Sequence, residues 1–180
     1  LYAVATFGNV SSAPLEMPLK DGSSTSLAVT NNWGEDYLLV KFNKDGEILW
    51  ATSIGSKFRE NGTPDVTVGE DGNPVICGVF NAANGNLMNE SEEKREFYIG
   101  EQKYLLYPEQ SKESALVKLN STDGSVMWSR YFTGTGNQEV LKVQAVSGSN
   151  AVAVTGKANN QIIVEGSAGL STETVTHVSG

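Results

Sequence analysis

The sequence predicts an all-β fold made of antiparallel four-stranded repeats, and two observations predict it. The first is an internal repeat, because the segment Leu-Val-Lys-Phe-Asn at positions 39–43 returns as Leu-Val-Lys-Leu-Asn at positions 116–120. The second is that no apolar stripe with the helical period lasts longer than about two turns. Both observations indicate strands throughout the chain.

Each copy of this segment is followed by an Asp-Gly turn and then by a strand that carries a tryptophan. Asp45 and Gly46 precede Trp50 in the first copy, and Asp123 and Gly124 precede Trp128 in the second. Asp-Gly turns tolerate the positive φ of tight hairpins and so fix the register of the strands that they join. We therefore expect the large ring to lie on the same face in every copy and to be buried against a neighbouring sheet.

The remaining strands follow in order from the same repeat. One unit reads as a strand at residues 65–68, a turn at 71–73 and a second strand at 74–80. A long insert at 81–113 comes next, and the hairpin of 114–120 with 125–132 closes the unit. Short β-like pairs occur inside the inserts, at 97–100 with 103–107 and at 161–164 with 173–176.

A third repeated element is an apolar strand that ends in glycine and polar residues. It occurs three times, and Gly78 and Gly156 are its glycines in the second and third copies. The three copies divide a single repetitive domain into units of approximately 1–62, 63–136 and 137–180. The first unit begins inside a repeat and the third stops where the next Leu-Val-Lys strand is due, so we expect a fragment of a longer protein.

The Leu-Val-Lys-Phe-Asn segment, the Asp-Gly turn, the tryptophan strand and the strand that ends in glycine together resemble a known bacterial β-propeller repeat. This repeat is often called the SBBP repeat and is found in secreted and outer-surface proteins. The stretch from Leu116 to Trp128 is also similar, less closely, to the tryptophan-docking repeats of pyrroloquinoline-quinone enzymes and of the propeller lipoprotein that helps to assemble outer-membrane barrels. The resemblance implies a radial propeller of which this chain forms about two and a half blades. It further implies an extracytoplasmic protein used for binding or scaffolding, without a particular ligand.

A propeller closes with about four to eight blades, so two and a half units leave unpaired edges. The rest of the ring is expected from missing sequence, from a partner chain or from self-association of several copies. A twisted stack of sheets or a β-sandwich is the alternative architecture.

Composition excludes several classes of partner. The chain of 180 residues is long enough for one sizeable core. Its formal charge of −8 and 13 scattered basic residues argue against nucleic acid. No run approaches the roughly 18 apolar residues of a membrane span. The single cysteine, Cys77, lies in an apolar run and is expected to be a buried, inert thiol.

The sequence offers no complete catalytic, cofactor or metal site. A serine or cysteine triad needs a histidine as its base, and the only histidine, His177, lies in a Thr-rich strand near the end of the sequence and is interpreted as a surface or packing residue. His177 and Cys77 together supply too few ligands for a zinc site. The Asp-Gly turns lack the alternating ligands of a calcium loop, so their aspartates are interpreted as turn formers. The glycines at 134–136 resemble a dinucleotide loop only weakly, because a third glycine is missing and a strand follows.

Glycosidase chemistry is the strongest enzymatic alternative. Residues 121–128 approximate the Asp-box turn of sialidase-type propellers, although the glycine comes one position early. The arginine cluster that such enzymes need is absent, since Arg59, Arg95 and Arg130 fall in three different contexts. The alternative hypothesis is therefore a fragment of a glycosidase-like or quinoprotein-like enzyme whose catalytic residues lie outside this chain.

The preferred hypothesis is a non-catalytic binding or scaffold module, extracellular or on the cell surface or outer membrane, with a protein or carbohydrate partner. Trp33 beside Asn31 and Asn32 is a candidate platform for stacking a sugar, and a packed loop anchor is its structural alternative. The charged run at 90–96 is interpreted as a solvated loop or a docking segment.

Overall fold

The computed structural model describes most of the chain. The described residues are 1–8, 14–27, 35–56, 62–81, 95–100, 102–106, 112–133, 137–159, 161–166 and 173–176.

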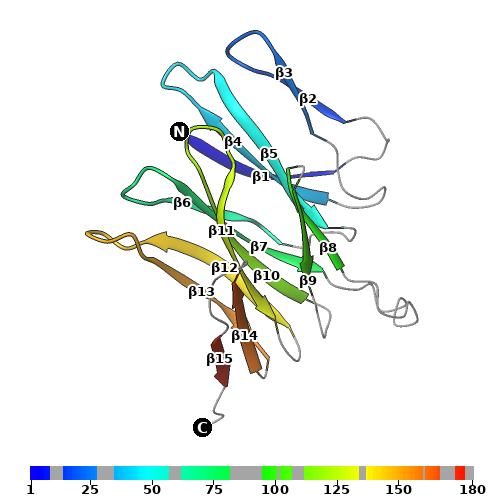
Figure 1. Cartoon of the computed structure of the whole chain (residues 1–180), viewed down its shortest axis with the longest axis vertical. Coiled ribbons are helices and arrows are strands. Elements are labelled where there is room, and N and C mark those ends of the chain that lie inside the picture. Colours follow the sequence, from blue (N-terminus) through cyan, green and yellow to red (C-terminus); the bar gives the residue numbers. More distant parts are fainter. Residues whose placement is uncertain are drawn as a thin grey trace.

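Every regular element in these ranges is a β-strand, and every strand pairing is antiparallel (Figure 1). The strands are β1 (Tyr2–Gly8), β2 (Leu15–Pro18), β3 (Ser24–Leu27), β4 (Glu35–Phe42), β5 (Ile48–Ser56), β6 (Asp65–Val68), β7 (Pro74–Asn81), β8 (Arg95–Ile99), β9 (Gln102–Leu106), β10 (Lys112–Leu119), β11 (Val126–Thr133), β12 (Gln138–Ala145), β13 (Val152–Ala158), β14 (Gln161–Gly166) and β15 (Glu173–Thr176). The prediction of an all-β fold is confirmed, while the described residues form no closed ring of sheets.

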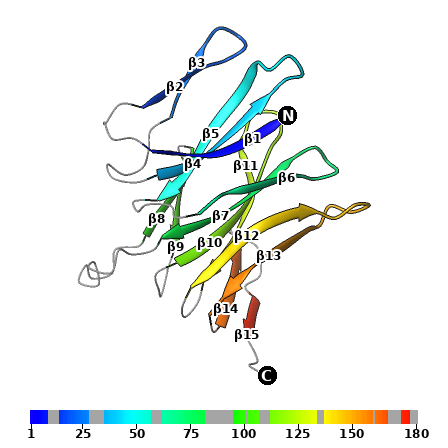
Figure 2. The same cartoon turned by 180° about the vertical axis from the view of Figure 1, so that it is seen from behind.

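The second repeat is the most complete one. Its strands β6, β7, β10 and β11 lie side by side in the predicted order. The first repeat contributes β1, β4 and β5, and the third contributes β12 and β13. In two opposite views, these three groups of strands follow one another along the long axis of the molecule (Figures 1 and 2).

The insert hairpins enlarge these sheets beyond four strands. The β8–β9 hairpin, an insert of the second repeat, pairs with β5 of the first repeat, where Ile54 faces Ile99. The β14–β15 hairpin, which belongs to the third repeat, pairs in the same way with β11 of the second, where Phe132 faces Val164. The resulting sheets have five and six strands, in the orders β1-β4-β5-β8-β9 and β15-β14-β11-β10-β7-β6. The insert hairpins of the second and third repeats thus each pair with the outer strand of the repeat before them.

The tight turns have the chemistry that the sequence predicts. Gly46, Gly72 and Gly124 have φ of 83°, 77° and 75°, a left-handed conformation that costs glycine little. The preceding aspartate fixes two of these turns, since Asp71 Oδ1 accepts the N–H of Asn73 at 3.1 Å and Asp123 Oδ1 that of Ser125 at 2.9 Å.

Two apolar clusters hold the repeats together. The first lies between the first and second repeats and includes Leu39 and Trp50 on one side and Val117 and Leu119 on the other. The second lies between the second and third repeats. It consists of Val75, Cys77, Leu116, Val140 and Val143, with Trp128, Phe132 and Val152 partly buried beside them. Burial raises the pKa of the Cys77 thiol to about 11, which agrees with the expectation of an inert cysteine.

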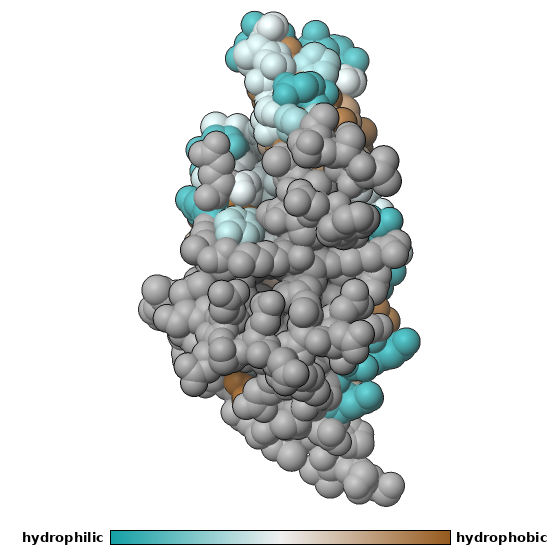
Figure 3. Space-filling model, turned by 90° about the vertical axis from the view of Figure 1, so that its right-hand side faces the viewer, coloured by the Kyte–Doolittle hydropathy of each residue, from teal (hydrophilic) through white to brown (hydrophobic). Residues whose placement is uncertain are grey.

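On the face that Figure 3 shows, the described surface at the end that carries β2 and β3 is mainly hydrophilic. This hairpin pairs with no other strand among the described residues. Its turn is fastened to the first repeat, because Lys20 N donates to the carbonyl oxygen of Ile48 at 2.8 Å.

Candidate functional site: the junctions between repeats

Trp50 is the centre of the junction between the first and second repeats. Its side chain is 7% exposed, and its indole Nε1 donates to the carbonyl oxygen of Ser121 at 3.1 Å. Its ring lies so close to Gly124 that a Cβ there would come within 3.0 Å of a ring carbon. The expectation that Trp50 is buried against the neighbouring sheet is confirmed, and the Asp-Gly turn of the next repeat is the surface that receives it.

Lys41 reinforces this contact from the adjacent strand. It faces Trp50 across the β4–β5 ladder, and its ammonium group also donates to the Ser121 carbonyl oxygen. The same ammonium lies 5.8 Å from the centre of the Tyr2 ring, a cation–π distance. Tyr2 in turn packs at 5.8 Å from the Trp50 ring, and burial raises the pKa of its hydroxyl.

The receiving turn is held in place by its own repeat. Asn73 Oδ1 accepts the N–H of Ser121 at 2.9 Å. Asp71 forms an ion pair of 2.6 Å with Lys118, whose side chain is 8% exposed. The hydrogen bond from Lys118 is the main reason that the pKa of Asp71 falls to about 2. The second repeat therefore presents a fixed turn to the tryptophan.

Tyr37 of β4 forms a second bridge across this junction. Its hydroxyl donates to the carbonyl oxygen of Val79 at 2.5 Å and accepts the N–H of Val79 at 3.1 Å. Val79 lies beyond the last residue of β7 that pairs with β6. The hydroxyl thus replaces a strand partner, since it both donates and accepts. Gly78 permits the approach, because a Cβ there would lie 2.2 Å from the tyrosine ring.

Ser114, which occupies the position of Tyr37 in the next repeat, does the same at the junction between the second and third repeats. Its hydroxyl donates to the carbonyl oxygen of Gln138 at 2.9 Å and accepts the N–H of Val140 at 2.8 Å. β12 has a register shift immediately after Val140. Gly156 lies opposite, where a Cβ would come within 2.0 Å of the backbone oxygen of Glu139.

A ladder of side-chain hydrogen bonds joins β6 to β12 with the period of the repeat. Asp65 Oδ2 accepts the N–H of Val143, and Thr67 Oγ1 accepts that of Ala145, each at 3.0 Å and each 78 residues away. Glu70 accepts the N–H of Gly148 with the same separation. Equivalent positions of successive repeats are thus bonded directly to one another.

Trp128 departs from the expectation that both tryptophans are buried. It packs beside the second apolar cluster but is only partly buried. Trp50 owes its burial to β10 and to the turn at Gly124, and no counterpart of that hairpin in the third repeat lies among the described residues. The two rings therefore differ in their coverage and not in their strand position.

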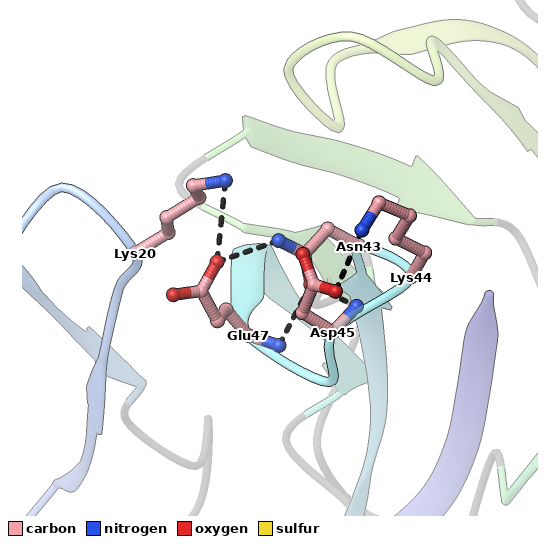
Figure 4. A network of polar contacts seen from close by, with 5 residues as sticks. All are labelled: Lys20, Asn43, Lys44, Asp45 and Glu47. Carbon is pink, nitrogen blue, oxygen red and sulfur yellow. Dashed lines mark hydrogen bonds and ion pairs between the residues drawn. The ribbon is translucent and has the colours of Figure 1, made fainter.

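The turn between β4 and β5 carries an exposed polar network (Figure 4). Asn43 Oδ1 accepts the N–H groups of Asp45 and Glu47, both at 2.9 Å. Glu47 binds Lys20 at 3.2 Å, and its pKa is lowered by the Asn43 amide first and by Lys20 second. Asn43 therefore caps this turn, while Asp45, which lies within the turn, pairs with Lys44 at 2.8 Å.

The candidate ligand platform of Trp33, Asn31 and Asn32 lies outside the described residues, as does His177. Within the described part of the chain, no group of three or more His, Cys, Asp or Glu side chains is arranged to hold a metal ion. The same part contains no helix that is long and apolar enough to cross a membrane.

No family model, no curated protein and no solved structure matches this chain.

Three features of the junctions were not expected from the sequence: the shared role of Tyr37 and Ser114, the acceptors Asp65 and Thr67, and the strands with which the insert hairpins pair. The sequence does contain a signal for the acceptors Asp65 and Thr67. Polar residues alternate along the strand at 65–68, and Val143 and Ala145 occupy the equivalent positions of the third repeat.

Proposed function

We propose that this chain is a non-catalytic binding or scaffold module of β-propeller type, carried by a secreted or cell-surface protein. The observation that supports the proposal is the use of its polar groups at the junctions. Lys41, Trp50 and Tyr37 reach the second repeat, and Asp65, Thr67 and Ser114 reach the third. Such groups serve to fix one repeat against the next, which is the task of a scaffold.

The partner that we propose is a carbohydrate or a protein at the cell surface, contacted by loops that the scaffold holds. Loops on a rigid framework commonly carry binding residues. Trp33, with the amides of Asn31 and Asn32 beside it in the sequence, has the combination of aromatic face and polar groups that stacks on sugars.

The first experiment is a glycan microarray probed with the chain and with the variant Trp33→Ala. We expect saturable binding to one class of glycan and at least tenfold weaker binding by the variant, because the stacking face is lost. Met127→Ala is the control, since Met127 is a large apolar side chain that is 51% exposed near the start of β11. Binding by Trp33→Ala equal to that of the parent would remove Trp33 from the site, and released sugar products would contradict a non-catalytic role.

A further inference from the structure

The outer edge of β13 is unpaired among the described strands, although the corresponding edge of the second repeat is paired. β13 pairs with β12 on one side, and no described strand pairs with the other side. Its residues from Ala153 to Lys157 are all exposed, Val154 among them. Its counterpart β7 pairs on this same side with β10, in a register that places Gly78 opposite Ala115.

A partly covered aromatic surface lies beside this edge. Trp128 and Phe132 of β11 pack against the second apolar cluster and are only partly buried. The equivalent residues of the first repeat, Trp50 and Ile54, are 7% and 1% exposed, because strands of the following repeat cover them. The two junctions thus have the same strand positions, covered in one and partly open in the other.

We propose that β13 accepts a β-hairpin of the same repeat type, whose first strand pairs antiparallel with β13 and whose turn glycine packs on Trp128. The model for this complex is the first junction, where β10 pairs with β7 and Gly124 packs on Trp50. Strand addition of this kind derives affinity from main-chain hydrogen bonds and specificity from alternate side chains. The inference rests on the proposed scaffold function and names its protein partner.

The hairpin comes from another segment of this repeat type and not from a second copy of residues 1–180. In the described chain both hairpins of this pattern are already paired on their two outer sides. β10 and β11 lie between β7 and β14, and β4 and β5 lie between β1 and β8. A second copy would have to break one of its own sheets to supply the strand.

The turn before β13 indicates that the incoming hairpin does not need a lysine at the position of Lys118. In the second repeat Lys118 lies on β10, the model for the first strand of the hairpin, and forms an ion pair with Asp71. The position equivalent to Asp71 in the third repeat is Ser149, whose hydroxyl donates to the carbonyl oxygen of Val146 at 3.3 Å. The third repeat offers no carboxylate at this position, so the hairpin gains nothing from a lysine there.

The test uses the full chain and a synthetic peptide of residues 112–133 in which Trp128 is replaced by phenylalanine. We expect saturable binding, slower amide exchange over residues 152–158, and a blue shift of the tryptophan emission that disappears when the chain itself carries Trp128→Phe. A peptide with Gly124→Val should bind at least tenfold more weakly. Its side chain would collide with the Trp128 ring, as a Cβ at Gly124 would crowd the Trp50 ring in the first junction. A peptide with Lys118→Gln should bind within twofold of the parent peptide.

A fusion of the same hairpin after Gly180 through a flexible Gly/Ser linker raises its local concentration and provides the second measurement. If residues 152–158 exchange as fast in the fusion as in the parent chain, the proposal is overturned. Protection of β1 in place of β13 overturns it as well. A dimer of the parent chain with β13 protected would replace the proposed occupant by a second copy. The glycan array is independent of all these readouts, so failure of the ligand hypothesis leaves the edge result unchanged.

Discussion

Glycine has two separate uses in this chain. At Gly124 it supplies a left-handed conformation and also a surface without a side chain for the Trp50 ring. At Gly78 and Gly156 the φ angle is not left-handed, and only the missing Cβ matters, since a tyrosine ring and a neighbouring strand occupy its place. A repeated glycine therefore does not have one explanation in every copy.

The two requirements at Gly124 can be separated by comparison with Gly46. Both residues have positive φ, but a Cβ at Gly46 would meet nothing within 4 Å. Gly46→Ala should cost about 1 to 2 kcal/mol through its backbone conformation alone. Gly124→Ala should cost about 1 to 3 kcal/mol more through overpacking against Trp50, as measured by urea unfolding. Equal losses in the two variants would show that the ring moves aside freely.

The ion pair of Asp71 with Lys118 predicts a specific dependence of stability on pH. The folded carboxyl has a pKa of about 2 against an ordinary value of 3.8, so the pair stabilises the fold above pH 4 and loses this effect as the pH falls toward 2. Asp71→Asn should therefore be less stable than the parent at pH 7, and most of the difference should be lost by pH 2 in urea titrations.

Asp123→Asn is the control for this prediction. The pKa of Asp123 is also lowered, but by Ser125 and not by a lysine. The loss in Asp71→Asn should shrink in 1 M NaCl, while that in Asp123→Asn should change less. An Asp71→Asn penalty that persists undiminished at pH 2 would mean that the carboxylate charge is not what stabilises this turn.

At the scale of elements, the sequence pattern predicts where strands and turns lie but not which distant strands pair. The strands at 65–68 and 74–80, the hairpin of 114–120 with 125–132 and the short pairs in the inserts all follow from alternation and turn residues. The partners of β8 and β14 could not be predicted, because a strand's alternation says which face is apolar but not which distant edge it will join.

The bridging hydroxyls were equally beyond prediction. Tyr37 and Ser114 occupy equivalent positions but share neither size nor hydropathy, so the repeat by itself gives no hint that both bond to the next unit. Their common role is visible only in the backbone groups that they reach. The candidate platform at Trp33 stays a prediction, since it lies outside the described residues.

Removal of the Ser114 hydroxyl should loosen the third repeat. Ser114→Ala leaves the Gln138 carbonyl and the Val140 N–H without this buried partner, a loss of about 1 to 3 kcal/mol. Chemical denaturation measures the loss, and amide exchange should accelerate first in β12. Ser125→Ala is the control, because the hydroxyl that it removes donates to the exposed Asp123 and takes no part in the junction. A comparable effect of both variants would assign Ser114 no special part in the junction.

At the scale of the whole molecule, the apolar clusters and the lent hairpins couple the repeats. The sheets of the first and second repeats each include a hairpin from the following repeat. β8 and β9 extend the sheet of the first repeat, and β14 and β15 extend that of the second. Cys77 lies in the cluster between the second and third repeats and so reports on their separation.

The prediction that follows is a single unfolding transition. At pH 8 the buried Cys77 thiol, with its raised pKa, should react far more slowly with a disulfide reagent in the native chain than in urea. The urea midpoint for thiol exposure should coincide with the midpoint for tryptophan fluorescence. Thiol exposure at clearly lower urea would mean that the third repeat opens on its own.

The lent hairpins also have a consequence for folding during translation. The outer edge of β5 is complete once Ile48–Ser56 has been made, yet its partner begins only at Arg95. The ribosome must therefore add several tens of residues while that edge is exposed, and the same delay recurs between β11 and β14. A nascent chain therefore exposes first the outer edge of β5 and later that of β11, and such unpaired edges favour aggregation until the insert hairpin has been made.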